Sequence, residues 1–540
     1  MSAPPAYTEP LNGAYRDWED TPDYKYSFEK PEKPVPAPAY DDAFPIETPR
    51  YNDTFFTYTF IATILGLSYM TYSAYVFDPQ LVTAAMSTSD MSKGMKALYT
   101  LIGVSTLTPL AFSAFLLGLV YLFPMAFVLL GFLLAPLTMF GMAITSLMAG
   151  AIFPALLSTA FGCFLLAFMF QNYSRFSFSA LMLKLVIAAM AKYPSTFFIS
   201  MLSSLITAAI AVGYMVSMAL IVNARAAKDD TTCPHTNGGD VCVSNTTIAI
   251  LLFVVFSGCY IFQVLQNTVH VTLAGVFSSW YFLDTYDENQ KPRHPALGAM
   301  KRALTYCFGS ICFGSLLVSI VQTIRISLQM LKSKLQNARH NRDSDNDFGS
   351  GDNGLLLCAL ICVVSVLEWI ASEFEYWMQW FNRYAYSYLA MYGKPYLQSA
   401  RDTFEILKYK GIDILINDSL ISTAISLYSI LAILVSAGVL ALVFNANELL
   451  KEMGPEMLVI GGVGSLITCW FIVSSAINVL DVGCVTFMVG LAVDPDAFTR
   501  TNAAGASEAN IRRLQFWEQM VRYYPGVRDR VTIDWPETTA

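Results

Sequence analysis

The sequence predicts an all-α, polytopic integral membrane protein with about ten transmembrane helices. Its composition is the first reason: 55% of the 540 residues are hydrophobic and only 14% are charged, whereas a soluble domain carries about a quarter charged residues. The mean hydropathy of +0.48 agrees. The second reason is a series of apolar runs, each close to the roughly 20 residues that a helix needs to cross the hydrocarbon core. We therefore expect lipid to be the solvent for most of the surface.

Three regions follow one another along the chain. Residues 1–54 are rich in Pro, acidic residues and Tyr, without apolar periodicity, which predicts a disordered cytoplasmic tail. This tail is not a signal peptide, because the first apolar run begins too late. Residues 55–492 contain the apolar runs and form the predicted ten-span transmembrane domain. Residues 493–540 form a predicted cytoplasmic C-terminal tail.

The predicted spans are bounded by breaks in hydropathy. An even number of spans places both termini on one side of the membrane. The spans are predicted at 55–77, 99–121, 124–146, 148–170, 196–222, 248–272, 304–328, 354–376, 418–444 and 456–478.

Positive charge assigns the termini to the cytoplasm, because three basic connections fall on their side. A fourth basic connection, 329–353, falls on the opposite side, so the crossing of 304–328 and 354–376 stays open. The three connections contain Arg175, Lys184 and Lys192, then Lys291, Arg293, Lys301 and Arg302, and finally Arg383, Lys394, Arg401, Lys408 and Lys410.

An outer loop is predicted at 223–247. It contains Cys233 and Cys242, which would form a disulfide in an oxidising exterior or remain two free thiols. The sequon that begins at Asn245 is a glycosylation candidate on the same face, although it lies close to the next span.

Two cytoplasmic connections are predicted to form surface helices. In 176–193 the apolar positions are interrupted by Lys184 and Lys192, which is typical of an amphipathic helix at the membrane interface. The segment 376–412 mixes aromatic residues with charges, and we interpret it as an aromatic interfacial belt.

A polar stripe occupies the span that begins at 248. Gln263, Gln266, Asn267 and His270 follow the spacing i, i+3, i+4, i+7, which places them on one helical face. Such side chains either bond neighbouring helices or line a substrate path. His270 adds a group that titrates near neutral pH and could carry a proton.

The last span offers a second polar face. Trp470, Ser474, Asn478 and Asp481 recur at helical spacing, and Asp481 either caps the membrane edge or is partly buried, since the apolar run resumes after it.

A carboxylate lies beside an aromatic ring at Glu368 and Trp369. This pair could bind a quaternary ammonium through cation–π attraction, or Glu368 could begin the exit of its helix into water.

Other classes of function lack sequence support. The chain has no basic patch interleaved with aromatic residues, so no nucleic-acid partner is expected. It has four His and no CxxC, HExxH or Gly-x-Ser-x-Gly motif. We expect no catalytic residue, cofactor or metal ion.

A short motif lies in the N-terminal tail. Pro4-Pro5-Ala6-Tyr7 reads as PPxY, the ligand of WW domains, because the prolines pre-form a polyproline helix and Tyr7 supplies an anchor. A Pro-rich tail can also match by chance. If a WW-domain ubiquitin ligase binds here, the expected consequence is endocytosis, which indicates a location in the plasma membrane.

Four strings of the sequence can be compared with known families: FNRYAYSYLAMYGKPYLQSARDTFEILKYKGIDILINDSL from Phe381, VTLAGVFSSWYF from Val271, GSICFGSLLVSIVQ from Gly309 and DDAFP from Asp41. They resemble the choline transporter-like family, also called solute carrier family 44, in its fungal branch. The resemblance implies a ten-span transporter with cytoplasmic termini, and choline uptake with proton exchange as in animal members. The connection 78–96 is much shorter here than in those members.

The predicted function is therefore transport of a small organic cation, choline or a choline-like solute, with a proton as the coupled ion. The path would be lined by the polar stripe and by the 470–481 face. The alternative is a non-transporting membrane scaffold or sensor in envelope or pH homeostasis, which would need these residues only for packing.

Overall fold

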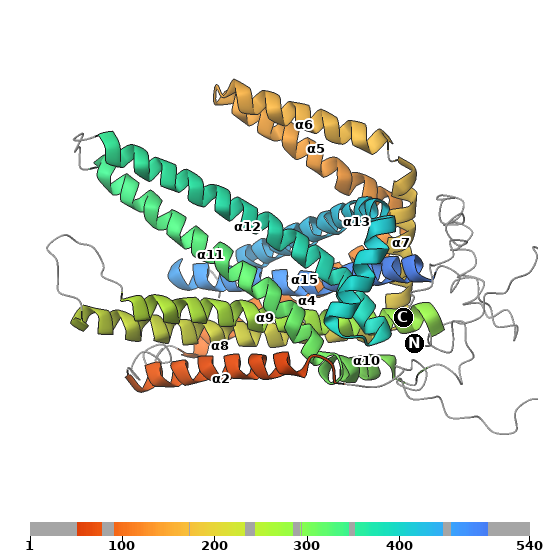
Figure 1. The fold of residues 1–540 in the computed structure, drawn as a ribbon. Helices are drawn as coiled ribbons and strands as arrows, with labels where there is room; N and C mark the ends of the chain where they lie inside the picture. The colour runs from red at the N-terminus through yellow and green to blue at the C-terminus, as the bar shows by residue number, and fades with distance from the viewer. Residues whose placement is uncertain are drawn as a thin grey trace, which may run out of the picture.

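The described part of the chain is helical throughout in the computed structural model (Figure 1), which describes residues 51–77, 91–171, 173–232, 244–283, 292, 294–344, 351–446 and 455–494. The helices are α2 (Thr54–Phe77), α4 (Met91–Leu122), α5 (Pro124–Met148), α6 (Ile152–Gln171), α7 (Tyr173–Lys192), α8 (Ser195–Thr232), α9 (Asn245–Leu283), α10 (Pro295–Leu304), α11 (Phe308–Ser344), α12 (Gly351–Tyr392), α13 (Tyr396–Ala446) and α15 (Pro455–Val493).

Each predicted span coincides with one of these helices, which confirms an all-α polytopic membrane protein. Within the described residues, eight segments are long and apolar enough to cross a membrane, and Leu107–Leu122 in α4 is a shorter apolar stretch. Parts of both α11 and α12 are among these eight segments. These two helices contain the predicted spans 304–328 and 354–376, whose crossing of the membrane the distribution of positive charge left undecided. The total of ten crossings stays a prediction.

Helix α15 forms the centre of the bundle. In its apolar segment Ile472–Val493, 72% of an 18-residue apolar stretch is buried inside the protein. The corresponding share is 11% in α6 and 6% in α12. Helix α15 contacts α4, α7, α8, α9, α12 and α13. The hairpins α5–α6 and α11–α12 splay away from the stack of α2, α8 and α9 (Figure 1). The apolar outer faces of these helices suit contact with lipid.

Each end of the described chain is hydrogen-bonded to the helical bundle. The backbone N–H of Asn52, just before α2, donates to the Tyr306 carbonyl at 3.2 Å. The Tyr281 hydroxyl at the end of α9 donates to the Asp494 carbonyl, just after α15, at 2.9 Å. Both termini of the helical domain lie at the right of Figure 1, with α7 and α10. The assignment of this end to the cytoplasm remains a prediction from charge.

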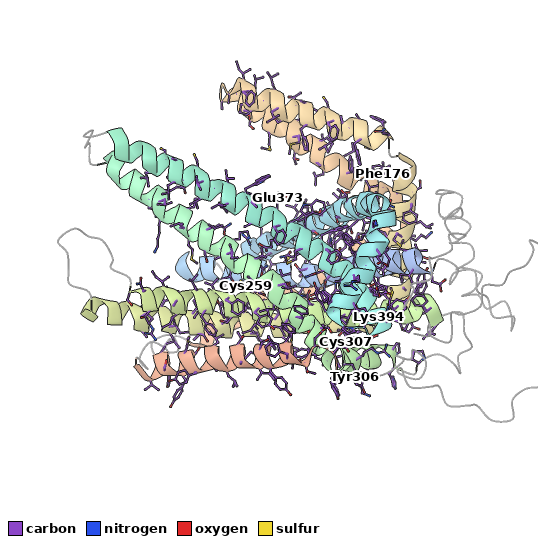
Figure 2. The ribbon with its side chains drawn as sticks, viewed as in Figure 1. Phe176, Cys259, Tyr306, Cys307, Glu373 and Lys394 are labelled. Carbon is purple, nitrogen blue, oxygen red and sulfur yellow. The ribbon has the colours of Figure 1, made fainter. Side chains whose placement is uncertain are left out.

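Helix α7 corrects the interfacial helix expected at 176–193. Phe176, Leu183 and Val186 are at most 1% exposed, and the helix packs against α4, α5, α13 and α15 (Figure 2). The reason is its apolar side chains, which extend around nearly the whole circumference and suit a buried helix rather than an interfacial one. Lys184 is half-buried, and its ammonium lies 5.4 Å from the centroid of the Tyr121 ring.

The segment 376–412 also differs from the expected surface helix. Residues 376–392 continue α12 without a break. The helix ends at Tyr392, and the next residue, Gly393, has a φ of +63°, which is accessible to glycine at little cost. Trp380 and Tyr384 are buried in the core rather than arranged in an interfacial belt. The aromatic residues from Trp380 onward therefore pack against the polar centre of the protein, whereas Tyr376 and Trp377 are exposed.

Several sequence predictions lie outside the described residues. The outer loop was expected at 223–247. Helix α8 extends to Thr232, so the first ten residues of that range are helical, and residues 233–243 are outside the described part. Outside the described residues lie the proposed disulfide residues Cys233 and Cys242, the tail motif of Pro4, Pro5 and Tyr7, and residues 495–540.

Helix α5 supplies a matched pair of glycines that tests its packing on α13. A Cβ on Gly131 would lie 2.4 Å from the carbonyl oxygen of Thr423, whereas a Cβ on Gly141 would meet nothing within 4 Å. We expect Gly131→Ala to lower the stability by about 1–3 kcal/mol, the usual cost of overpacking, and Gly141→Ala to change it little. Thermal unfolding of the purified protein in detergent measures both, and equal midpoints would contradict this contact.

Candidate functional site

An arginine shared by two carboxylates lies where α12, α13 and α15 meet. Nη1 of Arg383 donates to both oxygens of Asp481 at 2.8 and 2.9 Å. Its Nη2 donates to Oδ2 of Asp418 at 3.3 Å. We call these three residues the Arg383 cluster. With both carboxylates ionised, the cluster carries one net negative charge.

Burial makes this pairing necessary. The side chains of Asp418, Asp481 and Arg383 are 8%, 23% and 29% exposed. An isolated charge in such surroundings is strongly disfavoured unless an opposite charge and hydrogen bonds compensate it. Trp380, one turn before Arg383 on α12, donates its indole N–H to Oδ2 of Asp418 at 2.7 Å. The aromatic run of α12 thus supplies a hydrogen-bond donor as well as apolar packing.

His270 of α9 joins this site through the backbone of α12. Its Nε2 lies 3.0 Å from the carbonyl oxygen of Arg383 and 3.1 Å from Oγ of Ser387. A carbonyl oxygen only accepts hydrogen bonds, so Nε2 carries the hydrogen in the neutral ring and Nδ1 is the nitrogen that would take up a second proton. Thr486 of α15 donates to Ser387 at 3.4 Å. The structure therefore brings together two candidates, His270 and Asp481, that are far apart in the sequence.

The rest of the polar stripe divides between the interior and the surface. The amide of Asn267 donates to Oγ of Ser315 at 2.9 Å, and at 3.5 Å to both Gln263 and the Tyr386 hydroxyl. Gln266 is exposed. On a helix of 3.6 residues per turn, Gln266 lies about 60° from Gln263 on one side, whereas Asn267 lies about 40° away on the other. Gln266 is thus at the edge of the stripe, which corrects the expectation that all four residues face inward.

The predicted face of the last span lines an open cavity of about 350 Å³ between α13 and α15. Ser474, Asn478 and Asp481 all contribute to its wall. Helix α15 continues to Val493, beyond the predicted span end at 478, so Asp481 lies inside the helix rather than at its edge. The side chain of Trp470 is outside the described set. The other lining residues are Ser422, Ile425, Ser426 and Ile477.

The structure does not support the Glu368–Trp369 pair as a cation site. The Glu368 carboxylate accepts hydrogen bonds from Lys332 at 2.8 Å and Gln329 at 3.1 Å, both on α11. Trp369 is 64% exposed on the outside of α12.

Asn245, the glycosylation candidate, is the exposed first residue of α9. The preceding Ser244 accepts a hydrogen bond from the backbone N–H of Thr246 at 3.1 Å, as an N-terminal capping residue does. The sequon therefore lies within the first turn of the helix, and its glycosylation stays a prediction.

Two members of the cluster escaped the sequence-based selection. Arg383 was counted among the basic residues of a cytoplasmic connection, and Asp418 was placed at the edge of a predicted span. One signal was present: Arg383 is the only charged residue between Glu375 and Lys394, in a run rich in aromatic residues. A lone charge in such a run indicates a buried partner.

Comparison with known proteins places the cluster inside a matched family region. Residues 156–496 match the family model described as plasma-membrane choline transporter. The chain is similar to Protein PNS1 of Debaryomyces hansenii, with 33% identity over 98% of both chains. It is 32% identical to Protein PNS1 of Candida albicans over 96% of this chain and 94% of the relative. The identity to Protein PNS1 of Saccharomyces cerevisiae is 32%, over 88% and 86%.

The Arg383 cluster predicts an asymmetric response to loss of charge. Arg383→Gln leaves two carboxylates without their cation, so we expect a loss of stability of about 3–5 kcal/mol, as for other broken buried pairs. Asp481→Asn leaves Arg383 paired with Asp418 and should cost less. Midpoints of thermal unfolding in detergent check the order, with Arg401→Gln on the exposed side of α13 as the control. A variant Arg383→Gln as stable as this control would contradict the pairing.

Proposed function

We propose that this chain, which belongs to the plasma-membrane choline transporter family, carries a small organic cation, choline or a choline-like solute, across the membrane. The chain is a multi-pass membrane protein of a transporter family. One observation carries the choice of a cation: two carboxylates share the single cation of Arg383, and one of them, Asp481, lines a cavity, so that with both ionised the cluster has a net charge of −1.

The electrostatic reasoning begins at Asp481, which both binds Arg383 and lines the cavity. A cation entering the cavity would bring the net charge of the site to zero, and this attraction is strong where the dielectric constant is low. Arg383 can lose part of its contact with Asp481 and keep Asp418. We infer that the solute and Arg383 compete for the Asp481 carboxylate.

Polar groups in the same cavity suit a solute that also carries a hydroxyl group. Ser422 and Ser426 on α13 and Ser474 on α15 provide hydroxyls, which donate and accept. Asn478 adds an amide. The charged end of the solute would face Asp481, and its hydroxyl end would find partners among these side chains.

His270 is the proposed site of proton coupling. It is 5% exposed, and it contacts the carbonyl of Arg383. A second proton on this ring would place a positive charge beside Arg383 and lower the net negative charge of the site. Binding of the proton and binding of the cation would therefore oppose each other, as exchange of the two requires.

Uptake of labelled choline into liposomes tests this function. We expect saturable uptake that responds to an imposed pH gradient. His270→Gln should abolish the response to the gradient, because the ring that carries the proton is lost. Asp481→Asn should reduce uptake at least about tenfold, since one lost charge interaction of 1.4 kcal/mol or more has this effect.

The controls replace a histidine by glutamine and a carboxylate by its amide at exposed positions. His294→Gln, just before α10, and Glu373→Gln, on the outer side of α12 in Figure 2, should leave uptake and its pH response unchanged. Absence of uptake above empty liposomes by folded wild-type protein would reject choline as the solute. Insensitivity of every solute tested to Asp481→Asn would favour the scaffold or sensor function.

A location in the plasma membrane is proposed together with the tail motif. If a WW-domain ubiquitin ligase binds Pro4, Pro5 and Tyr7, Tyr7→Ala should slow removal of the protein from the cell surface, because the aromatic anchor is lost. Surface biotinylation at successive times measures the removal, with Tyr15→Ala in the same tail as control. Equal rates for wild type and Tyr7→Ala would remove this proposal.

A further inference from the structure

Residues 52 and 53 tie two helix junctions together at the end of the bundle where α2 begins. The Asn52 backbone N–H donates to the carbonyl of Tyr306, between α10 and α11, at 3.2 Å. The Asn52 side chain donates to the carbonyl of Gly393, between α12 and α13, at 2.8 Å. Figure 2 labels Tyr306 and Lys394 at this end of the molecule. A dipeptide before the first described helix thus bridges segments that are distant in the sequence.

The carboxylate of Asp53 makes the same connection a second time. Its Oδ2 accepts from the Ser310 hydroxyl at 2.6 Å and from the backbone N–H of Tyr396 at 3.0 Å. Ser310 lies in the first turn of α11, and Tyr396 is the first residue of α13. Asp53 has a φ of +52°, a left-handed conformation that Asp adopts more readily than most residues. We call Asn52, Asp53, Ser310, Gly393 and Tyr396 the Asp53 clasp.

The close approach of the clasp to α11 depends on a glycine. A Cβ on Gly309 would lie 2.2 Å from the carbonyl oxygen of Asn52 and 2.5 Å from that of Asp53. Only a residue without a side chain permits this contact. The backbone before α2 is therefore seated against α11 as well as hydrogen-bonded to it.

The clasp continues into the polar interior through Tyr396. The Tyr396 hydroxyl donates to Oδ1 of Asn382 at 2.6 Å, and Asn382 directly precedes Arg383. The Tyr396 ring lies 5.8 Å from the ring of Tyr386. The Tyr386 hydroxyl lies 3.5 Å from the amide of Asn267 and donates to a carbonyl of α11. Successive contacts thus connect Asp53 with the polar stripe of α9.

We propose that the Asp53 clasp is a gate at this end of the solute path, closed in this structure. The backbone N–H of Tyr396 also donates directly to Oγ of Ser310 at 3.2 Å. Loss of the two bonds to Asp53 would leave this contact as the remaining hydrogen bond of the clasp between α11 and α13, and its opening would let α11 separate from the α12–α13 junction and admit water to Ser315 and Asn267. This role rests on the transport function proposed above, because it regulates access to the same polar interior.

The chemistry of the clasp allows a matched pair of variants. Asp53→Asn keeps an oxygen that accepts from Ser310 and Tyr396, and Asn tolerates a positive φ. Asp53→Gly removes the acceptor and also fits a positive φ. The two variants therefore differ in the hydrogen bonds rather than in backbone strain.

The test is the rate at which a water-soluble maleimide labels a thiol introduced by Ser315→Cys, a position that is fully buried. The purified full-length protein is labelled in nanodiscs, and mass spectrometry locates each label, because the chain has ten native Cys. We expect labelling at position 315 at least about tenfold faster with Asp53→Gly than with native Asp53 or Asp53→Asn. Cys484, buried on α15 away from the clasp, should react equally slowly in all three.

The outcomes separate the gate from the identity of the solute. Faster labelling confined to position 315 in Asp53→Gly supports the gate, whether or not choline is transported. Equal labelling at position 315 in all three proteins overturns the gate, even if choline uptake is observed. Faster labelling at Cys484 as well would indicate general loosening and also overturn it. Monodisperse elution and cooperative thermal unfolding establish that each variant is folded.

Discussion

The fold depends on the pairing of buried charges in surroundings that disfavour them. Arg383 contributes the positive charge to two carboxylates on different helices, so α12, α13 and α15 must meet at one point. If any one of the three helices moved away, a charge would be left without its partner in the interior. The hydrogen bond from Trp380 and the contact of His270 with the Arg383 carbonyl bring the aromatic run of α12 and the stripe of α9 to the same place.

The same principle operates in the outlying hairpin of α11 and α12. Arg325 pairs with Glu375, and Lys332 pairs with Glu368 seven residues earlier on the antiparallel partner helix. These pairs connect two helices whose other surfaces are largely apolar and exposed. The hairpin therefore has polar contacts between its own helices as well as apolar packing, although it splays from the rest of the bundle (Figure 1).

The Arg383 cluster and the Asp53 clasp lie on one continuous set of contacts. Asn382 receives the hydroxyl of Tyr396 on the clasp side, and Arg383 binds Asp481 on the cavity side. Because these are consecutive residues of α12, the proposed opening of the clasp would act on the helix next to the residue that binds Asp481. Such an arrangement is suited to a carrier, in which occupation of the site and access from one side have to be coupled.

Hydropathy alone was sufficient for the fold class, because a helix that crosses lipid needs a long apolar run wherever it lies in the chain. Helical spacing likewise identified His270, Ser474, Asn478 and Asp481 as residues of the polar interior. The edges of helices were harder to predict: α12 continues through residues 376–392 and enters the core from Trp380 onward, and α7 is buried rather than interfacial.

Partner choice required the tertiary structure. Periodicity describes one helix at a time, so it could neither pair Arg383 with Asp418 and Asp481 nor show that Glu368 is bound by Lys332. The sequence by itself determined which segments are helical and apolar, since those properties are local. Which charges are buried together, and which dipeptide joins two helix junctions, was decided only by tertiary packing, because those contacts join residues tens to hundreds of positions apart.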